Sequence, residues 1–133
     1  MALTEERKNR LKALSEKYGL TKDDFFNFHG NPAITRTGIE KISAVENITV
    51  DYEVQALDVA NKIAVVKATA EMAKPTGGHK VVQTFGESAT YNTKNGYPVA
   101  MAEKRAFARA VLKLTEFYAI GIYSDSELDQ PEK

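Results

Sequence analysis

The sequence predicts an α+β fold: an antiparallel three-stranded β-meander packed against a long C-terminal helix, with a further helix at the N-terminus. Two observations carry this prediction. Residues 48–56 alternate between apolar and polar side chains, which is the period of a half-buried strand, and two more strand-like segments follow. Residues 98–118 are rich in strong helix formers, and Pro98 suits the first position of a helix.

The N-terminal part of the chain carries signals for two helices. Thr4 is placed to cap the first helix and Gly19 to end it. The apolar positions of this helix form only a narrow stripe, so we expect it to pack weakly or against a neighbouring subunit. A capped turn at 21–24 and a chain break at 30–32 follow, and then a short helix over 35–42.

The meander is expected to comprise strands at 48–56, 63–73 and 81–90, with a hairpin loop at 74–80 between the last two. One face of the second strand carries a row of mostly small side chains. The C-terminal helix carries small side chains at matching spacing (Ala102, Ala106 and Ala110). The two rows predict close packing of this helix across one face of the meander.

Length and composition bound the class of protein. A chain of 133 residues is expected to form one domain, here residues 1–122, followed by an acidic and disordered tail at 123–133. The tail holds four acids and one base, so the remainder of this formally neutral chain is positive by about three charges. No apolar run approaches the ~18 residues of a membrane span, and the N-terminus has no signal-like apolar region. We therefore expect no membrane contact and a cytoplasmic location.

Signals for catalysis are poor. The chain has no cysteine, and its two histidines, His29 and His79, lie far apart without the spacing of metal ligands. Asp51 and Glu53 share one face of a strand and could hold a divalent metal, although a solvated sheet surface explains them equally well. No phosphate-binding or nucleophile motif occurs. We expect a protein that is not an enzyme and has no cofactor and no metal.

Signals for nucleic-acid binding are better. Arg105, Arg109 and Lys113 are spaced i, i+4 and i+8 and so stack along one face of the helix, where they either present charge to a partner or form an ordinary solvated face. Single-stranded nucleic acid is typically held by cations together with stacking rings. Phe85 is expected to pack in the core instead. The candidate nucleic-acid-binding residues are Arg36, Lys41, Lys94, Lys104, Arg105, Arg109, Lys113, Tyr91 and Tyr97.

A meander followed by a basic helix is also the region in which the sequence resembles a known family. The stretch Ala102-Glu-Lys-Arg-Ala-Phe-Ala-Arg109 is similar to the DNA-binding helix of the single-strand annealing superfamily, which includes the phage Erf, Redβ and RecT proteins and the eukaryotic recombination mediator. The segments Phe85-Gly-Glu-Ser, 92–96 and 121–125 also match in position. In the mediator the second arginine follows the lysine by four residues, whereas Arg109 follows Lys104 by five, so Arg105 and Arg109 are the safer matched pair.

The resemblance covers about residues 46–125. It implies a β-β-β-α unit that binds single-stranded DNA without sequence preference and anneals complementary strands in recombination or replication. It also implies a homo-oligomer, either a ring or a filament, located in the host cytoplasm if the protein is phage-encoded. The acidic tail is expected to contact partner proteins. The alternatives are a protein-interaction domain, which the neutral charge favours, and a small-ligand-binding domain with a cavity between sheet and helix.

Overall fold

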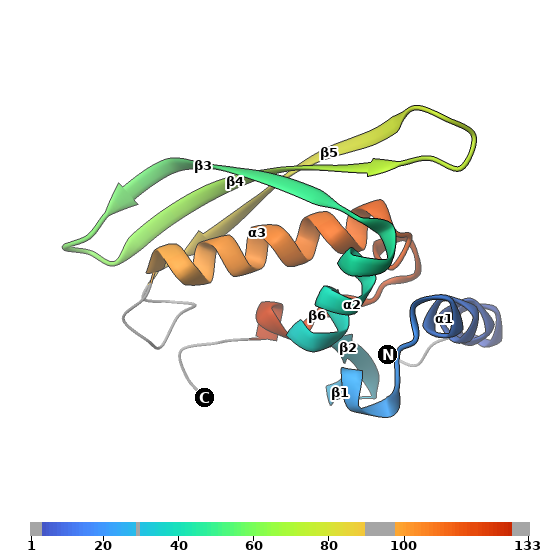
Figure 1. The fold of residues 1–133 in the computed structure, drawn as a ribbon. Helices are drawn as coiled ribbons and strands as arrows, with labels where there is room; N and C mark the ends of the chain where they lie inside the picture. Colours follow the sequence, from blue (N-terminus) through green and yellow to red (C-terminus); the bar gives the residue numbers. More distant parts are fainter. Residues whose placement is uncertain (1–3, 29, 90–97, 129–133) are drawn as a thin grey trace.

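The computed structural model describes residues 4–28, 30–89 and 98–128 and confirms the α+β fold. Helix α3 (Pro98–Leu114) lies between two layers, as Figure 1 shows. On one side lies the predicted meander of β3 (Thr49–Asp58), β4 (Ile63–Ala73) and β5 (His79–Ser88). Helix α2 (Arg36–Glu46) and a small second sheet lie on the other side. Helix α3, which the sequence predicts as the C-terminal element, therefore lies at the centre of the molecule.

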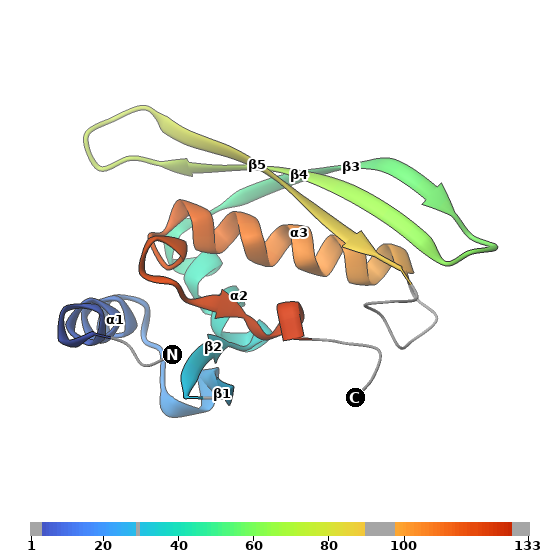
Figure 2. The same cartoon turned by 180° about the vertical axis from the view of Figure 1, so that it is seen from behind.

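The meander pairs in the order β3-β4-β5, and both pairs are antiparallel. The register of β3 against β4 shifts between Val54 and Ala56, where β3 holds one additional residue. Both hairpin ends of the meander project beyond the ends of α3, which is clear from both sides of the molecule (Figures 1 and 2). The strands are therefore covered by α3 only along their middle part.

Small side chains allow α3 to lie close to the meander. Ala64, Val66, Ala68 and Ala70 of β4 are fully buried or nearly so, and Ala102, Ala106 and Ala110 of α3 are fully buried. The two predicted rows do meet: Ala64 and Val66 pack with Ala102, and Ala70 packs with Ala110 and Leu114. The buried hydroxyl of Thr84 on β5 also donates a hydrogen bond to the Ala106 carbonyl at 2.7 Å.

The helices of the N-terminal half begin and end at capping residues. In α1 (Glu5–Tyr18) the Thr4 side chain accepts from the Arg7 N–H, and Gly19 ends the helix in the left-handed conformation. The stripe of α1 packs against the chain's own core through Leu14 and Tyr18. Helix α2 begins after its cap Thr35 as expected but is longer than predicted, since it runs to Glu46.

The second sheet was not predicted. It consists of β1 (Phe25–Phe28) and β2 (Asn31–Ile34), which form an antiparallel hairpin after the 3₁₀ turn η1 (Lys22–Asp24), and of β6 (Tyr123–Ser124), which pairs with β2 in parallel. The chain break expected at 30–32 is only partly correct: Gly30 lies in the turn of this hairpin, whereas Asn31 and Pro32 are the first residues of β2. The sequence gives no sign of β6 because a strand of two residues is too short to show an alternating pattern.

Two boundaries near the C-terminus also differ from the predictions. Helix α3 ends at Leu114 rather than at 118, because Glu116 adopts a left-handed conformation with φ of 76°. A 3₁₀ turn, η2 (Tyr118–Ile120), follows it. The predicted tail of 123–133 is wrong for its first part: residues 123 and 124 form β6, and η3 (Asp125–Leu128) is a further 3₁₀ turn. Ser124 and Ser126 are buried, so this part belongs to the folded domain.

Candidate nucleic-acid interface

Arg105 is a buried structural residue. Only 2% of its surface is exposed, and its guanidinium lies between β5 and the C-terminal turn η3. Its Nη1 donates to the Glu87 carbonyl at 2.8 Å, and its Nε donates to the Ser126 carbonyl at 3.2 Å. The prediction that Arg105 belongs to a solvent-facing cationic stripe is therefore wrong.

Arg109 lies one helical turn further along α3 and is surrounded by oxygen atoms. Its Nη1 donates to the Phe85 carbonyl at 2.6 Å and to Glu87 Oε1 at 2.8 Å. The Nε and Nη2 atoms donate to the two carboxylate oxygens of Glu127, at 2.6 and 2.8 Å. This hydrogen bonding to Glu127, and secondly to Glu87, raises the pKa of Arg109 above its ordinary value although burial acts in the opposite direction. The same contact lowers the pKa of Glu87.

The position of α3 explains why both arginines are used within the fold. Ala102, Ala106 and Ala110 face the middle of the meander, and Arg105 and Arg109 lie beside this row. Their side chains therefore reach the outer edge of β5, where no strand of the described residues pairs with the Phe85 and Glu87 carbonyls. Guanidinium groups satisfy these carbonyls and cover an edge that would otherwise be open to pairing.

Aromatic rings accompany Arg109 at this edge. Phe85 lies on the outer face of the meander, opposite Lys67 of β4, and is 48% exposed, so the expectation that it packs in the core is wrong. Tyr118 and Tyr123 contact each other edge to face, with ring centroids 5.2 Å apart. Together with Arg109 and Glu127 these two rings line a cavity of about 350 Å³. Phe85 contributes only its backbone carbonyl to the contact with Arg109, and its ring lies on the outer face of the same strand. We use the name β5-edge surface for Phe85, Arg109, Tyr118 and Tyr123, which lie along this edge of the meander.

The remaining predicted cations are spread over other parts of the molecule. Lys41 of α2 binds the buried carboxylate of Asp24 at 2.8 Å, and this carboxylate also accepts from the Thr21 N–H. Arg36 pairs with Glu40 one turn along α2.

Arg36 also lies over the ring of Phe107, 5.1 Å from its centroid. Lys113 is exposed at the end of α3, and Lys104 is partly exposed. The predicted site residues Lys94, Tyr91 and Tyr97 lie outside the described residues.

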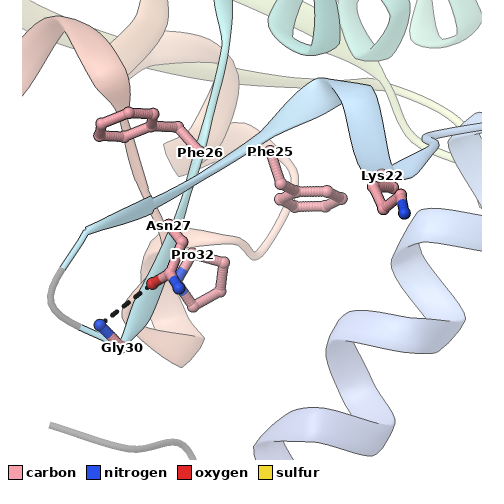
Figure 3. A pocket seen from close by; sticks show the side chains of 6 residues that line it. All are labelled: Lys22, Phe25, Phe26, Asn27, Gly30 and Pro32. Carbon is pink, nitrogen blue, oxygen red and sulfur yellow. Dashed lines mark hydrogen bonds between the residues drawn. The ribbon is translucent and has the colours of Figure 1, made fainter.

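A second cavity of about 350 Å³ lies on the β1–β2 hairpin (Figure 3). Its floor is held by a hydrogen bond from the Gly30 N–H to the Asn27 side chain at 3.0 Å. The rings of Phe25 and Phe26 leave β1 in opposite directions, as Figure 3 shows, so they cannot both stack on one ligand. Among the described residues of this lining, Lys22 is the one with a charged side chain. We therefore place the candidate interface at the β5-edge surface.

Neither a metal site nor a membrane segment is found in the described part of the chain. Within residues 4–28, 30–89 and 98–128, no three side chains of His, Cys, Asp or Glu are grouped so that they could hold a metal ion. None of the helices in these ranges has the length and the apolar character needed to cross a bilayer.

Sequence reasoning missed the residues that complete this surface. Glu87 and Glu127 could not be identified, because nothing in their local sequence predicts contact with Arg109, which is 22 and 18 positions away. Tyr118 and Tyr123 flank Gly121 and lie within the stretch that resembles the annealing superfamily. A glycine with aromatic residues on both sides, at 118 and 123, is the feature of the sequence that indicates an ordered turn here.

Comparison of the chain with protein-family models gives no match, and comparisons with curated proteins and with solved structures give none either.

Proposed function

We propose that this chain binds single-stranded DNA without sequence preference, and that the β5-edge surface makes the contact. The observation that carries the proposal is the position of Arg109 at a strand edge that also displays exposed aromatic rings. Cations that follow a phosphate backbone, combined with rings on which bases stack, are the usual means of holding single strands. The β-β-β-α order of β3, β4, β5 and α3 supports the proposal, since the superfamily that the sequence resembles carries DNA on such a unit.

The rings at this surface suit stacking. Phe85 and Tyr123 are each about half exposed, at 48% and 51%, so each residue has surface that a base can contact. Tyr118 supports Tyr123 from the side through the edge-to-face contact. Every base has a stacking face, so binding of this kind is tolerant of sequence.

Charge contributes less at this surface than the sequence suggested. Arg109 is neutralised by Glu87 and Glu127, and Arg105 is buried. Lys67, on the outer face opposite Phe85, pairs weakly with Glu53 at 3.5 Å. We therefore expect stacking to supply most of the affinity and the dependence on salt to be shallow.

Self-association is part of the proposal, because β3 is an edge strand that no other strand of the described ranges pairs with on its outer side. The side chains of Tyr52, Val54 and Leu57 lie on the inner face of β3 but are between 41% and 52% exposed, although their partners on β4 are buried. An exposed, apolar edge strand is normally paired or covered. We propose that a second copy of the chain covers it, and that the resulting oligomer anneals complementary strands as a binding protein in the cytoplasm rather than as an enzyme.

The same open edge favours a second candidate function, a protein-interaction module without nucleic-acid contact. The apolar row on β3 would then receive a different protein, and the formal net charge of zero suits this alternative.

Fluorescence polarisation with labelled oligo-dT, poly-A RNA and duplex DNA at two salt concentrations separates these functions. We expect oligo-dT to bind more tightly than duplex DNA. Phe85→Ala and Tyr123→Ala should each weaken binding of oligo-dT by about 1–3 kcal/mol, which is the usual contribution of one stacked base.

The matched control is Phe26→Ala. Phe26 is also about half exposed, at 49%, but lies on the β1–β2 hairpin, so its loss should leave the affinity unchanged. Absence of binding to oligo-dT at low salt would contradict the proposal. So would equal affinity of the wild type and a folded Phe85→Ala/Tyr123→Ala double variant.

A further inference from the structure

Arg105 and Arg109, which the sequence predicts to bind DNA, both contact the same short turn, and they do so at adjacent residues. Arg105 donates to the backbone carbonyl of Ser126, and Arg109 donates to the carboxylate of Glu127. Both oxygen-bearing residues belong to η3, close to the C-terminus. An i, i+4 pair of guanidinium groups thus faces a carbonyl and a carboxylate on consecutive residues.

The contact between Arg109 and Glu127 has the geometry of a phosphate complex. The Nε and Nη2 atoms bind one carboxylate oxygen each, at 2.6 and 2.8 Å, which is the two-pronged arrangement in which guanidinium also binds phosphate. Glu87 occupies the remaining side of the guanidinium through Nη1 and Nη2. A phosphate can therefore reach the fork of Arg109 only by replacing a carboxylate.

Of the two carboxylates, Glu127 is the one that a phosphate on the Nε and Nη2 fork replaces, and it belongs to a short turn outside the meander. Glu87 is part of β5, which is paired with β4 along its whole length. Glu127 belongs to a four-residue 3₁₀ turn whose backbone is held by Arg105 and by the bond from the Ser126 N–H to the Ser124 hydroxyl at 3.0 Å. Exchange of the Glu127 carboxylate for a phosphate also leaves the number of negative groups on Arg109 unchanged.

We infer that Glu127 is a built-in competitor for DNA, and that the turn η3 must release Arg109 before a phosphate of the single strand binds it. The inference rests on the proposed function and specifies how its site is regulated. The cavity bounded by Arg109, Tyr118, Tyr123 and Glu127 lies beside the rings on which a base stacks, so a base and its phosphate would arrive at the same place. The affinity of the wild-type chain for single-stranded DNA is therefore reduced by the free energy needed to separate Glu127 from Arg109.

The test compares Glu127→Gln with Asp125→Asn. The two variants remove one negative charge each from the same turn, but Asp125 contacts the Ser124 hydroxyl instead of Arg109. We expect Glu127→Gln to bind labelled oligo-dT roughly five- to tenfold more tightly than Asp125→Asn at low salt, because a charge-assisted bond to Arg109 is removed in the first variant alone. The log–log salt slope of Glu127→Gln should be steeper by up to about 0.7, which corresponds to one phosphate contact.

Hydrogen exchange of the wild-type protein provides a second readout that does not depend on a variant. Addition of oligo-dT should accelerate amide exchange within residues 124–128, whereas exchange in β4 should stay unchanged. Equal affinities of the two variants, or slower exchange of the turn upon binding, would overturn the inference and leave the proposed function intact. If the wild type and both variants fail to bind oligo-dT, the proposed function is overturned and the inference with it.

Discussion

Gly86 of β5 faces the backbone of α3 so closely that a Cβ atom at this position would overlap the carbonyl oxygen of Ala102. The neighbouring Ala106 nitrogen would lie 2.5 Å from the same Cβ. Both obstacles are backbone atoms of a helix, which cannot rotate away as a side chain can. We expect Gly86→Ala to reduce the free energy of unfolding by about 1–3 kcal/mol through overpacking.

Urea denaturation monitored by circular dichroism measures this loss. Gln83→Ala, on the outer face of the same strand, is the control and should change stability by less than about 0.5 kcal/mol. A Gly86→Ala variant as stable as the wild type would show that α3 does not lie against β5 in this way.

Substitution of Arg105 tests whether it is structural. Arg105→Met fills a similar volume but leaves the Glu87 and Ser126 carbonyls without their donor. A buried polar group without a partner costs about 1–3 kcal/mol, so we expect a loss of stability of at least this size. Lys113→Met, an exposed residue of the same helix, should be nearly neutral. A neutral Arg105→Met would place the guanidinium in solvent and restore the original prediction for this residue.

The stability of the fold should fall in acid through Asp24. Burial alone would raise the pKa of this carboxyl, but hydrogen bonds from Lys41 and from the Thr21 N–H outweigh burial and lower it. Because the pKa is lower in the folded state, the stabilisation is fully present above the unfolded value of about 3.9 and is lost as the pH falls through the folded value.

Asp24→Asn should therefore be less stable than the wild type at pH 7, by about 1–3 kcal/mol, and the difference should shrink below about pH 4. Thermal unfolding of both proteins across this range measures the effect. Asp23→Asn, an exposed neighbour with the same change in charge, should leave the acid dependence as it is in the wild type. A constant difference between wild type and Asp24→Asn at all pH values would refute the linkage.

Self-association should depend on strand β3. Light scattering at tens of micromolar is expected to give a mass above the 14.7 kDa of one chain. Val54→Lys introduces a charge into the exposed row of β3 and should shift the mass towards that of the monomer. Val81→Lys, on an exposed position of β5, serves as the control. A wild type that is monomeric under these conditions would rule out the proposed oligomer.

The elements with a long repeating pattern could be predicted from the sequence. The alternation along β3 and β4 and the Ala row of α3 are local patterns, and they correctly gave the meander and the face on which α3 packs. The caps Thr4 and Thr35 were found for the same reason, since capping involves residues within one turn. The hairpin of β1 and β2 has strands of only four residues and escaped detection.

The candidate site was less predictable because its contacts are distant in sequence. The spacing of Arg105 and Arg109 correctly placed them on one face, but it could not show what this face meets. What this face contacts depends on two features of the tertiary structure. The meander ends at β5 beside α3, and the C-terminal turn brings Glu127 back to the same helix. The acidic composition of the residues after Ile122 predicted a disordered tail, whereas Ser124 and Ser126 are buried and hydrogen-bonded to each other.

The parallel pairing of β2 with β6 has a consequence for the order in which the chain folds during synthesis. The β1–β2 hairpin is made before the meander and α3, but its residue Ala33 pairs with Tyr123, which is made only after them. Closure of such a long loop carries a large entropic cost and slows folding. Until β6 is made, the edge of β2 that pairs with it in the folded protein has no such partner.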